Sequence, residues 1–235
     1  EDHDYEEMKY FKLYGQKYTW QTDQKGAVGR FNPKSIKELL TEIPGDIAVF
    51  KDAYLKNNSL SAAVRQYVNS LFSTEGLIVL DADDRDLKMN FRSIIKDDLF
   101  EHSSKQHVDI STFQLEALGY HPQVHAREIN FFYLEDGLRN RIEKKGDEFV
   151  VVDSDLRFSE DQIIKMINEE PEKFSPNVIL RPLYQETILP NLAYVGGPAE
   201  VIYWLQFKSM FDHFKVPFPL LMPRNFALIM DAPSL

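Results

Sequence analysis

The sequence of 235 residues contains no cysteine. It therefore has no disulfide framework, no thiolate zinc site and no cysteine nucleophile, and its composition fits a reducing compartment such as the cytoplasm. No apolar run approaches the roughly 18 residues that a membrane span needs. Basic residues are in deficit, with 27 Lys and Arg against 37 Asp and Glu, a net charge of -10. This charge is compatible with a local basic pocket, but we expect neither nucleic acid nor a membrane as a partner.

The composition is otherwise that of a folded domain. Hydrophobic residues make up 43% of the chain and aromatic residues 13%, enough for a substantial core and for one domain, or one domain with an insertion. The first residue is Glu1 rather than Met, and it opens directly into a charged cluster. We expect the chain to be a piece of a longer protein.

That first cluster, EDHDYEE, is a candidate chemical site. Six of its seven residues are acidic or His, and carboxylates flank His3 on both sides. Asp2, His3 and Asp4 can hold a divalent cation or form an oriented general base. The alternative is a solvated acidic end of the chain.

A second candidate is the turn formed by residues 194–200, YVGGPAE, around which the chain is organised. Gly196 and Gly197 precede Pro198 at the first helical position, and Glu200 lies in the first turn of a helix predicted over residues 199–214. Apolar residues surround that helix, so we expect it to be largely buried. The glycines would let backbone N–H groups converge on an anion at the helix N-terminus. The alternative is a sharp turn before a core helix.

The remaining patterns alternate between strand and helix. We predict short apolar strands at residues 76–80 and 177–180, a polar hairpin over residues 17–31, and an antiparallel meander over residues 128–152. Helices are predicted from Ser35 to before Pro44, over residues 46–56, from Ser59 or Ser61, over residues 87–102 and 104–118, and from the cap Ser159.

Acidic residues follow the first apolar strand. Asp81, Asp83 and Asp84 follow the carboxyl end of the strand predicted over residues 76–80, the place where ligands bind in open α/β sheets. The alternative is that they form a solvated turn or the N-cap of the next helix. His121 and His125 flank Pro122 in a predicted loop rather than a helix, so we assign no metal site there.

The simplest architecture is an α/β fold: an open Rossmann-like sheet with a long mixed α+β insertion. The core would comprise residues 1–16 and 156–235, and the inserted connective region residues 17–155.

Four stretches in order, EDHDYEE, GLIVLDADDRDLK, SPNVILRPLYQETILPNLAYVGGPAEVIYWLQ and MPRNFALI, resemble the cysteine-adding enzymes of bacillithiol biosynthesis. The most specific part is RPLYQETILPNLAYVGGPAEVIYW, residues 181–204, and the likeness spans nearly the whole chain. The resemblance implies a Rossmann-like core related to nucleotidylyltransferases and class I aminoacyl-tRNA synthetases. It also implies a ligase that adds cysteine to glucosaminyl malate, with ATP as the cosubstrate that activates the carboxylate.

Members of that family are longer. They carry an upstream Gly- and Gln-rich motif and a C-terminal coiled coil used for dimerisation, both absent from this sequence. The resemblance thus implies a homodimer for the full-length protein, and we expect this piece alone to be inactive.

The resemblance also implies roles for individual residues. His3 would position the reacting amine or acyl group, with Asp2 or Asp4 fixing its tautomer. Glu200 would bind an amine, and Arg181 or Arg224 a malate carboxylate. The backbone of Gly196 and Gly197 would approach the anionic ligand. The candidate pocket walls are Gln185, Tyr194, Tyr203 and, ranked lowest, Trp204. Asn225 and Phe226 stand near a position where the family suggests a small hydroxyl residue, which weakens a phosphate role for that loop.

Two other classes of function stay open. One is a metal-dependent hydrolase or transferase that uses Asp2, His3, Asp4, Asp81 and Asp83. The other is a non-catalytic binding domain in which the acidic clusters are solvated faces.

Overall fold

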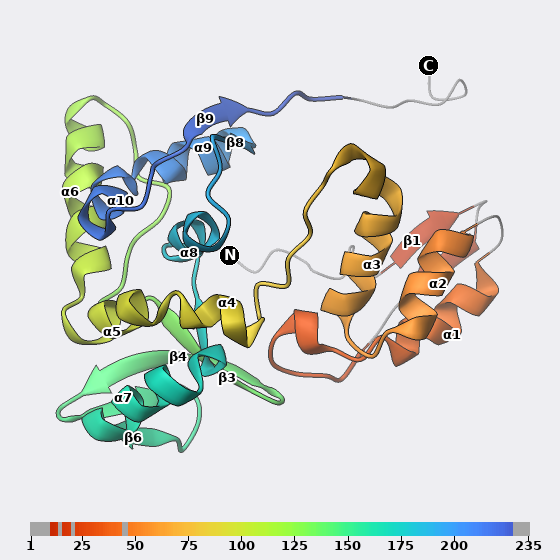
Figure 1. Cartoon of the computed structure of the whole chain (residues 1–235), viewed down its shortest axis with the longest axis horizontal. Coiled ribbons are helices and arrows are strands. Elements are labelled where there is room, and N and C mark those ends of the chain that lie inside the picture. Colours follow the sequence, from red (N-terminus) through yellow and green to blue (C-terminus); the bar gives the residue numbers. More distant parts are fainter. Residues whose placement is uncertain (1–9, 14–15, 20–21, 44–46, 228–235) are drawn as a thin grey trace. The chain divides into compact units, whose positions relative to one another are not determined.

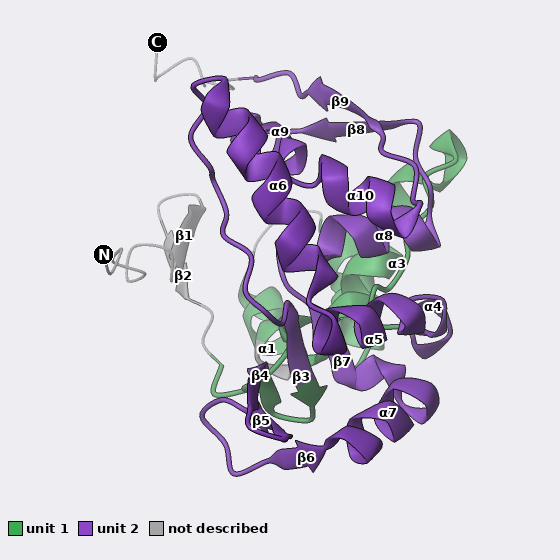
Figure 2. Ribbon diagram, turned by 90° about the vertical axis from the view of Figure 1, so that its left-hand side faces the viewer, with its two compact units in different colours: residues 1–84, 134–140 green, residues 85–133, 141–235 purple. Residues whose placement is uncertain are grey.

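The computed structural model describes residues 10–13, 16–19, 22–43 and 47–227 (Figure 1). The chain divides into two compact units, shown in separate colours in Figure 2. Unit 1 comprises residues 1–84 and 134–140, and unit 2 comprises residues 85–133 and 141–235. The predicted boundaries between core and insertion stay a prediction, because most of the first core segment, residues 1–16, lies outside the described residues.

Unit 1 is built on three helices, α1 (Lys34–Glu42), α2 (Ala48–Lys56) and α3 (Leu60–Phe72), followed by the 3-10 turn η3 (Ser73–Glu75). The helices share a small core made of Leu40, Ala53, Tyr54, Leu60 and Ala63. Ser59 caps α3 as predicted, because its Oγ accepts the N–H of Ala62 at 3.3 Å.

The predicted hairpin over residues 17–31 is wrong in position. The hairpin lies earlier, where β1 (Tyr10–Leu13) pairs antiparallel with β2 (Gln16–Thr19), and residues 28–30 form the 3-10 turn η2 (Val28–Arg30). Residues 24–32, which include η2, are closed by a side chain: the Gln24 amide accepts the N–H of Asn32 at 2.6 Å and donates to its carbonyl at 2.9 Å. A side-chain amide thus takes the place of a strand partner.

The predicted buried strand at residues 76–80 is also wrong. These residues belong to no strand in the described structure, and Leu77 and Ile78 are 47% and 62% exposed. An apolar run indicates a buried strand only where neighbouring elements supply both a hydrogen-bonding partner and cover.

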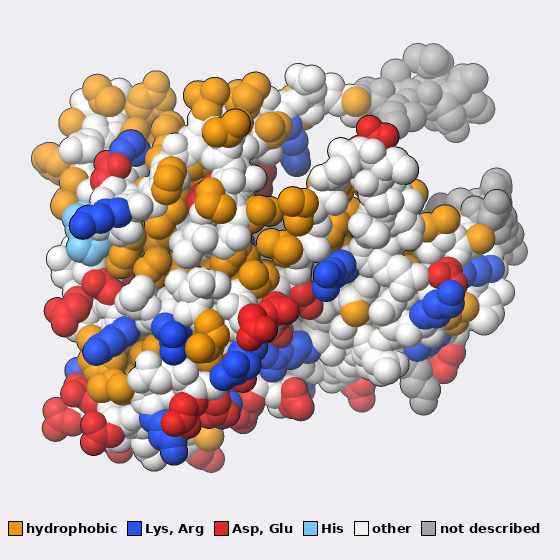
Figure 3. All heavy atoms as spheres, viewed as in Figure 1, with side chains coloured by type: hydrophobic (Ala, Val, Ile, Leu, Met, Phe, Trp, Pro, Cys, Tyr) orange, Lys and Arg blue, Asp and Glu red, His pale blue; other side chains and the backbone are white. Residues whose placement is uncertain are grey.

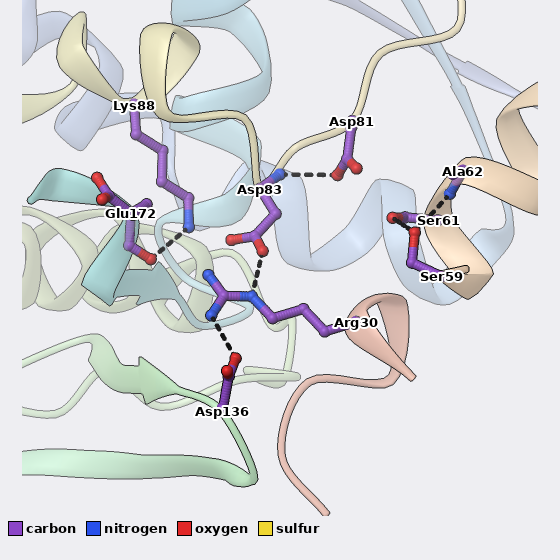
Figure 4. Close-up of polar contacts among 9 residues, drawn as sticks. All are labelled: Arg30, Ser59, Ser61, Ala62, Asp81, Asp83, Lys88, Asp136 and Glu172. Carbon is purple, nitrogen blue, oxygen red and sulfur yellow. Dashed lines mark hydrogen bonds and ion pairs between the residues drawn. The ribbon is translucent and has the colours of Figure 1, made fainter. Parts of the chain in front are cut away.

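Unit 2 begins with three helices, α4 (Arg85–Met89), α5 (Arg92–Phe100) and α6 (Ser103–Ala117). The single helix predicted over residues 87–102 is therefore broken, with Asn90 and Phe91 between its halves. Lys88 of α4 is only 3% exposed and donates from Nζ to the backbone carbonyl of Glu172, at 3.3 Å (Figure 4). This contact ties α4 to the 3-10 turn η4 (Pro171–Lys173).

A five-stranded sheet follows, in the order β6-β5-β4-β3-β7; the end of β3 and the start of β4, residues 134–140, are counted in unit 1. Its strands are β3 (Phe131–Glu135), β4 (Leu138–Lys145), β5 (Glu148–Val151), β6 (Arg157–Ser159) and β7 (Phe174–Pro176). The pairs β3–β7, β4–β5 and β5–β6 are antiparallel. The predicted meander is confirmed, as is the Ser159 cap of α7 (Glu160–Glu169), where Ser159 and Gln162 bond each other's backbone N–H.

The last part of unit 2 is a parallel strand–helix–strand unit. After α8 (Arg181–Ile188), strand β8 (Ala193–Gly196) pairs in parallel with β9 (Leu220–Pro223), and α9 (Pro198–Leu205) and α10 (Lys208–Phe214) connect them. The two helices cover a core of Trp204, Phe207, Met210 and Phe211, all wholly buried. Parallel strands with a helical crossover are the building block of Rossmann-like folds.

The segment from residue 177 to residue 214 differs from the sequence prediction in two respects. Residues 177–180 form a turn rather than a strand, because the Asn177 side chain accepts backbone N–H groups of that turn. The helix predicted over residues 199–214 is interrupted at Gln206. The side chain of Gln206 is buried, and its Oε1 accepts the N–H of Gln123 at 2.8 Å while its Nε2 donates to the carbonyl of Val124 at 3.0 Å.

Apolar side chains gather over the α9–β9 region on the face shown in Figure 3. The exposed members in and beside these elements are Leu192, Val195, Ile202, Leu205, Leu220 and Met222. Among the described residues, no helix is both long enough and apolar enough to cross a membrane.

Candidate functional site

The candidate site is the turn between β8 and α9, and the parallel strand pair sets its shape. The N–H of Arg224, just after β9, donates to the carbonyl of Gly196 at 2.8 Å. The Glu200 carboxylate, one helical turn later, accepts the N–H of Gly197 at 2.7 Å and the hydroxyl of Tyr194 at 3.2 Å. The strand end, the turn and the first turn of the helix are therefore bonded together around Glu200.

The two glycines matter for close approach rather than for backbone conformation, since neither has a left-handed backbone. A Cβ at Gly196 would lie 2.7 Å from Cε1 of Tyr194, closer than carbon atoms pack. A Cβ at Gly197 would lie 3.3 Å from both Arg224 Nη2 and Glu200 Oε2. The absence of side chains here lets the Tyr194 ring and the Arg224 guanidinium approach the turn.

Arg181 links α8 to α9. Its guanidinium donates to Oε1 of Gln185 at 3.1 Å and to the hydroxyl of Tyr203 at 3.3 Å. The charge of Arg181 contributes to the lowered pKa of Glu200 and offsets part of the rise in the pKa of Tyr194. Residues from α8, β8, α9 and the end of β9 thus meet at one place.

The electrostatics favour an ionised carboxylate and a protonated phenol. The pKa of Glu200 is lowered, first by the Gly197 N–H bond, then by the Tyr194 hydroxyl and by the positive charges of Arg224 and Arg181. Burial and the neighbouring Glu200 charge raise the pKa of Tyr194. At neutral pH the turn therefore presents one negative carboxylate in the field of two arginines, which suits a ligand with both carboxylates and an amine.

The other predicted wall residues lie beside this turn. The amide of Gln185 donates to the buried Glu186 at 3.0 Å, and Trp204 stacks on Tyr194 with ring centroids 4.1 Å apart. Trp204 is wholly buried and its Nε1 has no hydrogen-bond partner among the described residues. Trp204 is therefore a core residue that supports Tyr194.

Of the two predicted acidic clusters, the structure describes only Asp81, Asp83 and Asp84, which belong to unit 1. Asp2, His3 and Asp4 lie outside the described residues. In unit 1, Asp83 accepts the Nε of Arg30 at 2.5 Å, and its N–H donates to Asp81 at 3.0 Å; Arg30 also approaches Asp136 (Figure 4). Across residues 10–13, 16–19, 22–43 and 47–227, no three His, Asp or Glu side chains are grouped so as to hold a metal ion.

Sequence reasoning missed a buried polar network next to the site. Asp98 of α5 and Asn130 before β3 are both wholly buried and hydrogen-bonded to each other, and Asn130 is bonded to Asn177 before α8. Asp98 is one of two adjacent acidic residues in the segment IIKDDLF, and only its position on the inner face of the helix distinguishes it as a buried residue. No pattern of spacing predicts its partners.

Comparison with known proteins decides the family. A family profile described as "Bacillithiol biosynthesis BshC, N-terminal Rossmann-like domain" matches residues 1–225. The chain belongs to the BshC family. Its relatives include proteins named "Putative cysteine ligase BshC" from Cytophaga hutchinsonii, 46% identical over 97% of this chain, and from Flavobacterium johnsoniae, 43% identical over 97%.

The BshC relatives are longer than this chain, which spans 44% and 45% of those two proteins. The resemblance carried by residues 181–204 is confirmed, and the Rossmann-like class is confirmed with it. Arg181, Gln185, Tyr194, Gly196, Gly197, Glu200, Tyr203 and Arg224 lie together in this BshC chain, and their roles toward substrate stay predictions.

Proposed function

We propose that the full-length BshC protein is a ligase that joins the carboxyl group of cysteine to the amine of glucosaminyl malate, the last step of bacillithiol biosynthesis. Family membership and the names of the relatives support this reaction. One feature of the structure supports it: the Glu200 carboxylate is bonded to the Gly197 N–H, and the charges of Arg181 and Arg224 act on it and lower its pKa. Glucosaminyl malate has the complementary groups, two carboxylates and one amine.

In this proposal the two arginines bind the malate carboxylates, and Glu200 binds and orients the amine. Charge-assisted hydrogen bonds of this kind are worth about 1.5–3 kcal/mol each. Tyr194 stays protonated and donates to Glu200, which holds the carboxylate in place. His3, with Asp2 or Asp4, would take the proton that the amine loses on forming the amide.

Amide formation from a free carboxylate needs an activated acyl group, and ATP would supply that activation. The backbone N–H of Gly197 is already bonded to the Glu200 carboxylate, so this donor is taken and does not serve a phosphate. We therefore assign no residue of the turn to ATP. The proposal also includes a cytoplasmic location and a homodimer of the full-length protein.

The test is calorimetric titration of glucosaminyl malate into full-length protein, with and without ATP. Arg181→Ala and Glu200→Gln should each weaken binding by about 10- to 100-fold, the loss of one charge-assisted contact. Arg157→Ala is the matched control, since Arg157 is a half-exposed arginine on β6 that pairs with Glu148 at 3.8 Å. Equal affinity of wild-type protein and Arg181→Ala, or no binding to the folded protein, would contradict the proposal.

A further inference from the structure

The buried network of unit 2 begins at Asp98. Its carboxylate accepts the hydroxyl of Ser104, the backbone N–H of Asn130 at 2.6 Å and the Asn130 amide at 3.3 Å. A buried carboxylate is costly unless donors surround it, and here three donors from two other segments do so. Asp98 thus anchors the chain segment that enters β3.

Asn130 connects Asp98 to Asn177 by hydrogen bonds. Its amide nitrogen donates to Ser104 at 2.9 Å and to the Arg127 carbonyl at 2.7 Å, as well as to Asp98. Its amide oxygen accepts the side-chain amide of Asn177 at 3.0 Å, and its backbone carbonyl accepts the Asn177 N–H at 3.0 Å. Both the nitrogen and the oxygen of the Asn130 side-chain amide are therefore hydrogen-bonded. Asn177 makes two hydrogen bonds to Asn130, one to its side chain and one to its backbone.

Asn177 in turn sets the start of α8. Its side-chain oxygen accepts the N–H of Ile179 at 2.8 Å, and its backbone carbonyl accepts the N–H of Arg181 at 2.9 Å. Ile179 is wholly buried, so this turn has little freedom to shift. The first residue of α8 after this turn is Arg181, whose guanidinium contacts Gln185 and Tyr203 at the candidate site.

We infer that Asp98, Asn130 and Asn177 are positioning residues that fix the Arg181 guanidinium for a substrate carboxylate, an inference that rests on the function proposed above. None of the three touches the turn at Gly197. They act through the backbone of residues 177–181, and two-point recognition of a carboxylate requires a guanidinium held within about 0.5 Å. An apolar core would support the fold without directing hydrogen bonds to this one backbone position.

The test is steady-state kinetics of the full-length ligase with Asn177→Ser. Serine keeps an oxygen that can cap the turn but cannot donate to Asn130. We expect the KM for glucosaminyl malate to rise about tenfold, with kcat and the KM for cysteine nearly unchanged, as for lost binding of one substrate. If Asn177→Ser does not fold, Asn177→Asp is used in its place, because aspartate is isosteric with asparagine and also lacks the N–H that donates to Asn130.

A double variant separates positioning from a purely structural role. With Arg181→Ala already present, Asn177→Ser should raise KM no further, because the group that it positions is gone. Asn57→Ser is the control: Asn57 in unit 1 donates its amide to Ala53 and Gln66, and its loss should leave KM unchanged.

The possible outcomes are distinct. If Arg181→Ala raises KM but Asn177→Ser and Asn177→Asp do not, or if the effects of the two positions multiply, the positioning inference is overturned while the proposed function stands. If Arg181→Ala itself leaves KM unchanged, the proposed substrate site fails and the inference fails with it.

Discussion

Replacing the buried Asp98 by asparagine should change how stability depends on pH. Burial raises the pKa of this carboxyl from its ordinary 3.8 to about 6, and hydrogen bonds from Ser104 and Asn130 lower it only in part. Because the folded pKa is the higher one, the folded state binds more protons than the unfolded state between about pH 4 and pH 6. The contribution of Asp98 to wild-type stability therefore falls as the pH rises through that window, by about 3 kcal/mol for two pKa units.

Urea unfolding of wild-type protein and Asp98→Asn at about pH 4 and pH 7.5 measures this difference, and the titrations common to both proteins cancel. The stability of the variant relative to wild type should improve by about 3 kcal/mol from the lower to the higher pH. Asp109→Asn is the control, because Asp109 is an exposed residue of α6 that pairs with Lys105, a surface contact worth at most about 1 kcal/mol. A relative stability of Asp98→Asn that is no more pH-dependent than that of Asp109→Asn would refute the reasoning.

Three further predictions concern local features of unit 2, each measured as a change in the free energy of unfolding. Gly196→Ala should cost about 1–3 kcal/mol because its Cβ meets the Tyr194 ring, whereas Gly197→Ala should cost less than about 1 kcal/mol because the groups that it meets are ends of flexible side chains; equal costs would contradict this. Ser159→Ala should cost about 1 kcal/mol through loss of the α7 cap, and no change would mean that water replaces the cap. Phe149→Ala should cost about 3–5 kcal/mol because the ring is wholly buried in the sheet, and a cost below about 1 kcal/mol would refute that packing.

The elements that could be predicted from the sequence are those set by contacts close in the chain. Ser59 and Ser159 cap helices because each needs only a backbone N–H three residues ahead. The meander follows from alternating strands joined by tight turns, where Gly137 and Gly146 take left-handed backbones. Such features depend on a few neighbouring residues, so local patterns suffice.

The wrong predictions depended on contacts distant in the chain. Residues 177–180 are as apolar as a strand, but the Asn177 side chain, held by Asn130, turns them into the start of α8. The helix predicted over residues 199–214 breaks at Gln206, whose side chain binds the loop at Gln123. No periodicity within either segment reveals a partner 47 or 83 residues away.

For the candidate site, the sequence by itself determined which residues to consider. The glycine pair, the following Pro198 and the acidic Glu200 predict a turn into a helix, and the resemblance over residues 181–204 indicates the family. The tertiary structure alone decided how these groups meet. Parallel pairing of β8 with β9 places Arg224 beside Gly196, and the Glu200 carboxylate takes up the Gly197 N–H that sequence reasoning had assigned to a ligand. The physical reason is that hydrogen-bond donors and charges choose their partners by distance in space, which only the packing of strands and helices sets.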